Sequence, residues 1–113
     1  RDGCGEDRTW PVCSKTSGNT EQGLCDMVGN VWEWTLDEYE NSYSGAPSNG
    51  DARCNASDCS KNANQSARRV LRGSGWYHGY ATSLCAANRD HSIPSNRNTV
   101  FGGRVVKSVS LKN

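Results

Sequence analysis

The amino-acid sequence predicts one small domain of short strands and long loops around an aromatic core. Only 34% of its 113 residues are hydrophobic, the mean hydropathy is −0.82, and 12 residues are glycine. This composition is too polar and too rich in glycine for a helical bundle, and the length suits one modest core. The four tryptophans argue against disorder, because disordered chains are poor in aromatics and each tryptophan can bury roughly 150–250 Å².

The first half of the chain is expected to supply one strand between two irregular segments. Residues 1–22 show no periodicity, and residues 37–67 are polar and contain the Asn49-Gly50 turn, so both are predicted to be loops. Residues 31–36 alternate as a half-buried strand does. Val31, Glu33 and Thr35 share one predicted face; Trp32, Trp34 and Leu36 share the other.

The second half is expected to supply two further strands. Residues 68–73 predict a strand that ends at Gly73, and the β-branched run in 103–109 predicts another. Residues 74–99 are mostly polar loop around a short apolar island at 84–87. No segment predicts a helix of more than about two turns, and residues 85–89 could supply a short strand instead.

The charge balance excludes some classes of partner. Thirteen basic and twelve acidic residues give a net charge of +1, so no general attraction to nucleic acid or to an anionic membrane is expected. No apolar run approaches the roughly 20 residues of a membrane-spanning helix, so no membrane insertion is expected. The expected partner is a protein or another surface ligand.

Six cysteines in so short a chain favour disulfides and an exported, oxidising location, and this chain itself contains no signal-peptide pattern. Six cysteines allow fifteen connectivities. Local spacing suggests Cys4–Cys13 and Cys54–Cys59, which leaves Cys25 and Cys85 as a long-range pair. A zinc site is the weaker alternative, because no C-x-x-C motif occurs and His78 and His91 lack finger-like spacing.

The order of the motifs resembles the second half of the formylglycine-generating (sulfatase-modifying factor) family. The matching blocks are G-L-C-D-M-V-G-N-V-W-E-W-T, R-V-L-R-G-S-G-W, C-A-A-N-R-D, P-S-N-R-N and G-G-R-V-V-K-S, within roughly residues 10–108. The resemblance implies an α+β fold of the C-type-lectin-like kind. It implies one domain over residues 1–113 that corresponds to the C-terminal half of a sulfatase-modifying-factor domain. Variable proteins of diversity-generating retroelements share the same pattern.

The resemblance also implies a structural calcium site in the first block. The family's ligands map onto the side chains of Asp26 and Glu33 and the carbonyls of Gly29 and Val31. Carboxylates and backbone carbonyls are the oxygens that calcium binds. The alternative is a hydrogen-bonded turn in which Glu33 accepts backbone N–H groups. A calcium-dependent melting temperature would distinguish the two.

One departure from the family bears on function. Formylglycine-generating enzymes carry two catalytic cysteines just after the tryptophan of the second block, whereas residues 77–83 here contain none. No catalytic residue is therefore assigned. An oxidase that uses copper would need a thiol pair able to bind Cu(I). That oxidase, or a fragment of one, is the alternative function.

The favoured function is a non-catalytic ligand-binding domain. Its loop after Trp76 is rich in tyrosine, serine and glycine, which binding loops favour. Residues 77–83 can all be reached from an asparagine codon by changes at adenine, as diversification by a retroelement would require. The predicted binding residues are Tyr77, His78, Tyr80, Thr82, Asp90, His91, Ser92, Asn98 and Thr99.

Overall fold

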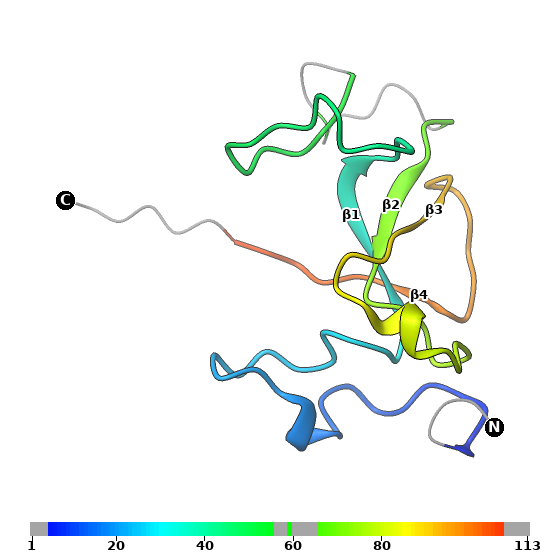
Figure 1. Ribbon diagram of the computed structural model, residues 1–113. Helices are drawn as coiled ribbons and strands as arrows, with labels where there is room; N and C mark the ends of the chain where they lie inside the picture. The colour runs from blue at the N-terminus through cyan, green and yellow to red at the C-terminus, as the bar shows by residue number, and fades with distance from the viewer. Residues whose placement is uncertain (1–4, 56–58, 60–65, 108–113) are drawn as a thin grey trace.

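In a computed structural model, which describes residues 5–55, 59 and 66–107, four short strands form one sheet (Figure 1). They are β1 (Trp32–Glu38), β2 (Arg69–Arg72), β3 (Asp90–Ser92) and β4 (Phe101–Gly102), in the order β3-β2-β1-β4. The described residues also include the 3-10 turns η2 (Thr16–Gly18) and η3 (Ala81–Leu84). They contain no α-helix, so the helical part of the expected α+β class is not found in them.

The strand β1 lies inside the sheet and is paired on both sides. It runs antiparallel to β2, with Trp34 opposite Leu71, and the register shifts between Trp34 and Glu38. It runs parallel to β4, with Trp32 opposite Phe101. The strand β3 lies at the other edge, antiparallel to β2. The sheet therefore brings together four strands that lie far apart in the sequence, with β1 and β2 at its centre.

The core is small and centred on a tryptophan, as the sequence predicts. Trp32, Leu71 and Val100 are buried together, and Trp34, Trp76 and Phe101 pack against them. Burial of a large aromatic ring among aliphatic side chains removes much apolar surface from water at one position. This is how a chain of such low hydropathy can form a core.

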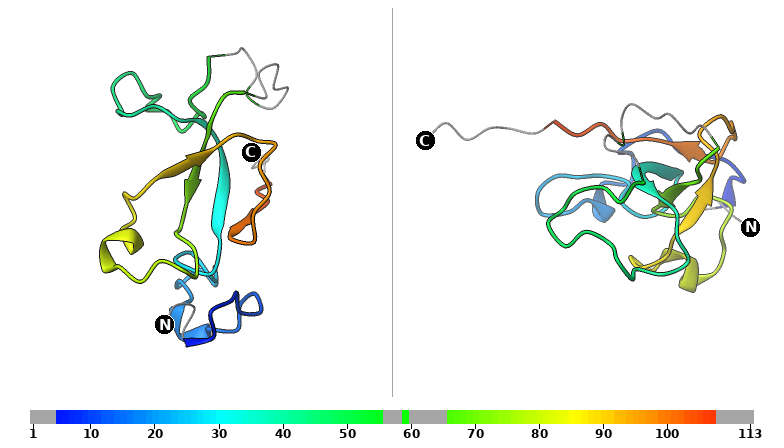
Figure 2. Two further views of the ribbon diagram at one scale, coloured as in Figure 1. Left: turned by 90° about the vertical axis from the view of Figure 1, so that its right-hand side faces the viewer. Right: turned by 90° about the horizontal axis from the view of Figure 1, so that it is seen from above.

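Irregular chain occupies both ends of the sheet. Residues 5–30 lie at the end where β1 begins, and residues 39–55 form a loop at the opposite end (Figures 1 and 2). Backbone bonds tie the second loop down, since Glu38 N donates to Arg53 O and Tyr39 N donates to Arg68 O. The turn η3 lies toward the same end of the sheet as residues 5–30.

The strand predictions were partly wrong. Residues 103–107 are not a strand: Val105 and Val106 are fully exposed, because no neighbouring strand pairs with them in the described part of the chain, and 108–109 lie outside it. The last strand is instead β4. The short strand after residue 85 is β3, which begins at Asp90 rather than within 85–89. Leu36 is 58% exposed because β1 extends past the core at that point, so the predicted alternation holds only near Trp32 and Trp34.

The disulfide predictions were correct for one pair. Cys54–Cys59 is formed, with 5.7 Å between the Cα atoms. Cys13 pairs with Cys25 at 5.1 Å between the Cα atoms, so the predicted pairs Cys4–Cys13 and Cys25–Cys85 are both wrong. Loop 14–24 folds back on itself and brings Cys13 to Cys25. Cys85 is exposed and free, and Cys4 lies outside the described residues.

Candidate functional site

A cavity of about 450 Å³ lies where the N-terminal segment meets the loop after β2. Three segments line it: residues 10–18, residues 26–30, and residues 75–84. Its apolar wall consists of Trp10, Met27, Val28, Trp76 and Leu84. Lys15, Asp26, Asn30 and His78 supply the polar groups. An apolar hollow with a few convergent polar groups is the usual form of a ligand site.

Asn30 holds the three segments of this cavity together. Its side chain exchanges two hydrogen bonds with the backbone of Trp10, at 3.1 and 3.2 Å. Its carbonyl accepts a hydrogen bond from Trp76 N at 2.9 Å. Asn30 has a φ of 62°, a left-handed conformation that asparagine tolerates better than most residues. One residue thus positions both tryptophans of the cavity.

The turn after β2 depends on Gly73 and Gly75. Gly73 has a φ of 93°, and its carbonyl accepts a hydrogen bond from Gly29 N. A Cβ atom on Gly75 would lie 3.1 Å from Cδ1 of Trp32 and 3.2 Å from Cε1 of Tyr77. Gly75 therefore lets the backbone approach the core tryptophan closely, and this directs Trp76 and His78 into the cavity wall.

The ring of His78 is fixed by aromatic contacts. It lies 4.0 Å from the Tyr77 ring and packs edge-on against Trp32 at 5.4 Å, measured between ring centroids. Its Nδ1 atom is buried without a hydrogen-bond partner among the described residues, as are Trp32 Nε1 and Ser74 Oγ. Unpaired buried polar atoms are uncommon in folded proteins. One of the three, Trp32 Nε1, lies 3.4 Å from the position that a Cβ atom on Gly75 would take, and His78 itself lines the cavity.

The charged groups of the cavity are one cation and one carboxylate. The Lys15 ammonium lies 3.5 Å from the centroid of the Trp10 ring, a cation–π contact. The Asp26 carboxylate accepts a hydrogen bond from Cys13 N at 2.8 Å. The site therefore offers both a positive and a negative group beside its apolar wall.

The mapped calcium ligands lie next to an arginine. Arg104 Nε and Nη2 donate to the two carboxylate oxygens of Glu33 at 3.0 and 2.7 Å. Arg104 Nη2 also donates to the carbonyls of Cys25 and Asp26. The hydrogen bond to Glu33, with the charges of Glu33 and Asp26, raises the pKa of Arg104. No pattern in the sequence predicts these four hydrogen bonds of Arg104, although Gly103-Arg104 stands in a matching block.

The carboxylates and carbonyls of this stretch remain suited to a hard cation. A carboxylate has about four lone-pair sites, so Glu33 can bond to Arg104 and to an ion together. The carbonyls of Met27 and Val31 both approach Gly73, at 3.4 and 3.8 Å from its Cβ position. The mapped oxygen donors are of the chemical type that calcium binds, and the calcium site stays a prediction.

The nine predicted binding residues do not form one surface. His78 lines the cavity, while Tyr77, Tyr80 and Thr82 lie exposed on the adjoining loop. Asp90, His91 and Ser92 form β3 at one edge of the sheet, whereas Asn98 and Thr99 precede β4 at the other. His91 packs on Tyr39 at 4.1 Å between ring centroids, which is a structural contact. The prediction missed Trp10, Lys15 and Asn30, since no local pattern shows that residues 10–18 fold over the loop after Trp76.

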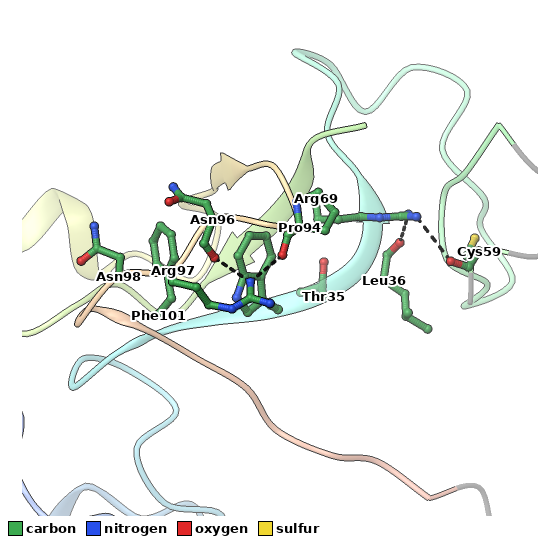
Figure 3. A pocket seen from close by; sticks show the side chains of 10 residues that line it. Thr35, Leu36, Cys59, Arg69, Pro94, Asn96, Arg97, Asn98 and Phe101 are labelled. Atoms are coloured by element: carbon green, nitrogen blue, oxygen red, sulfur yellow. Dashed lines mark hydrogen bonds between the residues drawn. The ribbon is translucent and has the colours of Figure 1, made fainter. Parts of the chain in front are cut away.

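A second hollow, of about 550 Å³, contains Asn98 but is less suited to a ligand (Figure 3). Its two arginines are committed to backbone carbonyls. Arg97 donates to Pro94 O and Asn96 O, and Arg69 donates to Leu36 O and Cys59 O. Figure 3 shows both guanidinium groups turned toward these carbonyls. The cavity beside Trp76 is therefore the better candidate site.

The fold and the motif order point to the formylglycine-generating (sulfatase-modifying factor) family, and comparison with a known structure supports this assignment. The structure of PvdO from Pseudomonas aeruginosa superposes with a TM-score of 0.71 at 31% identity, over 88% of this chain and 34% of PvdO. The serine/threonine-protein kinase Pkn1 of Chlamydia trachomatis serovar L2 is 33% identical over 101 residues, 89% of this chain and 15% of the kinase. The chain thus spans about a third or less of each relative.

The sequence model of the sulfatase-modifying factor enzyme 1-like domain matches residues 3–109. The chain belongs to this family, as the motifs predicted. The two disulfides indicate a non-reducing environment. No described segment forms a helix long and apolar enough to cross a membrane.

Proposed function

We propose that this chain is a non-catalytic ligand-binding domain of the family, and that the ligand binds at the cavity beside Trp76. The observation that carries the proposal is the convergence of the loop after Trp76 with Trp10 and Lys15 around one apolar hollow. The partner is a protein or another surface ligand outside the cell. Residues 1–113 bind it as a single domain.

The exposed tyrosines support a protein-like ligand. Tyr80 is 77% exposed and Tyr77 is 39% exposed, on a loop that leads into the cavity wall. Tyrosine gives a large amphipathic contact at low conformational-entropy cost, which is why paratopes favour it. A peptide could place one apolar side chain in the cavity and lie across these rings. Of the nine predicted residues, the site keeps Tyr77, His78, Tyr80 and Thr82.

The proposal is tested by selecting binders from a random peptide library displayed on phage. We expect clones that bind the wild-type protein and lose at least about tenfold in affinity, or 1.4 kcal/mol, with Tyr80→Ser. The matched control is Tyr43→Ser, because Tyr43 is 56% exposed but lies in the loop at the opposite end of the sheet. Binders that respond equally to both variants, or a selection that yields none, would contradict the proposal.

The chemistry of the cysteines favours binding over the oxidase. A copper-dependent oxidase needs a thiol pair, and Cys85 is the one free cysteine that the described residues offer. We expect no conversion of a cysteine-containing sulfatase peptide to formylglycine when the protein is incubated with copper and oxygen, as measured by mass spectrometry. Turnover of that peptide would establish the alternative instead.

Retroelement diversification of the loop is a separate part of the proposal. It predicts a reverse transcriptase gene near the coding sequence and a near-copy of the codons for residues 76–100. In that copy, the differences from the coding sequence fall at adenines. A genomic neighbourhood without both features removes diversification and leaves the binding site unaffected.

A further inference from the structure

We propose that reduction of the disulfide Cys13–Cys25 creates a binding site for a soft divalent metal ion such as Zn²⁺. The Sγ atoms of Cys13 and Cys25 and a carboxylate oxygen of Asp26 all lie within 4.8 Å of one another. Among the described residues this is the one cluster of three cysteine, histidine or acidic groups placed closely enough to hold a single ion. The proposal is independent of the ligand-binding function.

The backbone around this cluster already sets the donors in place. Cys13 has a φ of 61° and Asp26 a φ of 52°, left-handed conformations that non-glycine residues seldom adopt. The hydrogen bond from Cys13 N to Asp26 Oδ2, at 2.8 Å, joins the two residues without involving either sulfur. Because this bond does not depend on the disulfide, it keeps the backbone of Cys13 beside the Asp26 carboxylate when the disulfide opens.

Arg104 fixes the other side of the cluster. Its Nη2 donates to the carbonyls of Cys25 and Asp26, at 2.8 and 3.4 Å. Because Arg104 is itself paired with Glu33 on β1, the backbone of residues 25–26 is attached to the sheet. The segment that carries two of the three donors therefore does not depend on the disulfide for its position.

The chemistry balances with a dithiol as reductant. A dithiol transfers two electrons and two protons to the disulfide, which gives two thiols and the oxidised cyclic disulfide of the reagent. Binding of M²⁺ then releases the two thiol protons, and two thiolates with one carboxylate coordinate the ion. Zinc sites combine cysteine and carboxylate ligands, and three protein ligands leave a fourth position open.

The surroundings leave room for a reductant and for the fourth ligand. Cys13 is exposed, whereas Cys25 and Asp26 are half-buried. Asp26 also lines the 450 Å³ cavity. A metal ion held by these residues would therefore lie at the cavity rim, with its fourth position taken by water. Oxidation expels the ion, because the disulfide sulfurs are no longer thiolates.

The test uses two backgrounds that each retain two cysteines. The first, C4S/C54S/C59S/C85S, keeps Cys13 and Cys25; the control, C4S/C13S/C25S/C85S, keeps Cys54 and Cys59. Both are reduced, placed in calcium-free buffer and titrated with Cd²⁺, which reports thiolate binding through its charge-transfer absorption. We expect one equivalent to bind the first background at least about tenfold more tightly than the control.

The variant Asp26→Asn decides whether the folded cluster binds the ion. In the first background it should weaken binding by about tenfold or more, since it replaces a carboxylate ligand with an amide. An unfolded chain would bind Cd²⁺ through its thiols alone, without regard to Asp26. Equal affinity in both backgrounds, no effect of Asp26→Asn, or equal binding by the oxidised protein would overturn the proposal.

Discussion

Replacing Arg104 with methionine should destabilise the fold more than replacing an exposed arginine such as Arg8. Methionine keeps the length and apolar character of the stem but removes four hydrogen bonds, two of them to Glu33. The side chains of Arg104 and Glu33 are 31% and 22% exposed, so the pair is neither buried nor fully solvated.

The magnitude follows from this intermediate exposure. Exposed ion pairs contribute about 0.2–1 kcal/mol, whereas breaking a buried pair costs about 3–5 kcal/mol. We therefore expect Arg104→Met to lower the free energy of unfolding by about 2 kcal/mol. In a domain of this size that corresponds to a fall in Tm of roughly 8 °C.

The assay is urea unfolding monitored by tryptophan fluorescence, with Glu33→Gln and the double variant completing the cycle. Neighbours that interact directly should show a coupling energy of about 1 kcal/mol or more. The matched control is Arg8→Met, since Arg8 pairs with Glu6 at 3.3 Å but is 75% exposed. We expect that control to change stability by less than about 0.5 kcal/mol. Equal effects of Arg104→Met and Arg8→Met, or coupling below about 0.5 kcal/mol, would refute the reasoning.

The contribution of the Arg104–Glu33 pair to stability depends on pH with a definite sign. The pKa of Arg104 is raised by its hydrogen bond to Glu33, so the folded state holds this proton more tightly than the unfolded state does. The resulting stability is fully present below the unfolded pKa and is lost only as pH rises through the folded pKa. The contribution of Arg104 protonation should therefore stay constant throughout the neutral range.

Three further predictions concern the metal and the core. If calcium binds Asp26, Gly29, Val31 and Glu33, Tm should be higher in calcium than in chelator. The variant Asp26→Asn should abolish this difference. Equal melting temperatures of the wild-type protein in calcium and in chelator would contradict the calcium site. Leu71→Ala should lower the free energy of unfolding by about 2–5 kcal/mol, because Leu71 is 0% exposed and the truncation leaves a void in the core. A decrease below about 1 kcal/mol in urea unfolding would contradict the assigned core. Gly102→Ala should lower the free energy of unfolding by about 1–2 kcal/mol, because the new Cβ would lie 2.7 Å from Val31 Cγ2. The control Gly103→Ala should be neutral, because a Cβ there meets nothing within 4 Å. Equal shifts in Tm for the two variants would show that β4 is placed wrongly.

The core was predictable from sequence because its signal is local. Trp32 and Trp34 stand in a short alternating stretch, and Val70 and Leu71 stand in a short predicted strand that ends at glycine. Such patterns predict which residues turn inward. They do not reveal which strand pairs with which. Val105 and Val106 have strong strand propensity yet lie exposed, because a strand also needs a partner edge, and β4 takes that edge with Phe101 and Gly102.

The candidate site was less predictable, because its walls come from distant segments. The composition of residues 77–83 pointed to the loop, and His78 does lie in the cavity wall. Trp10 and Lys15 reach the same wall only because Asn30 bonds to the backbone of Trp10, twenty positions away. Asp90 and Asn98 share the polar character of binding residues, but the sheet order places them near opposite edges. Polarity alone does not distinguish a residue in the cavity wall from a residue near an edge of the sheet.

The parallel pairing of β1 with β4 has a consequence for synthesis of the chain on the ribosome. Glu33 and Arg104, which fasten these strands together, are separated by 71 positions. At about 5–20 residues per second, roughly 4–14 s pass between translation of the two residues. During that interval β1 carries Trp32 and Trp34 with one edge unpaired, a state prone to association with other chains. The nascent domain should therefore depend on chaperones until β4 and Arg104 emerge.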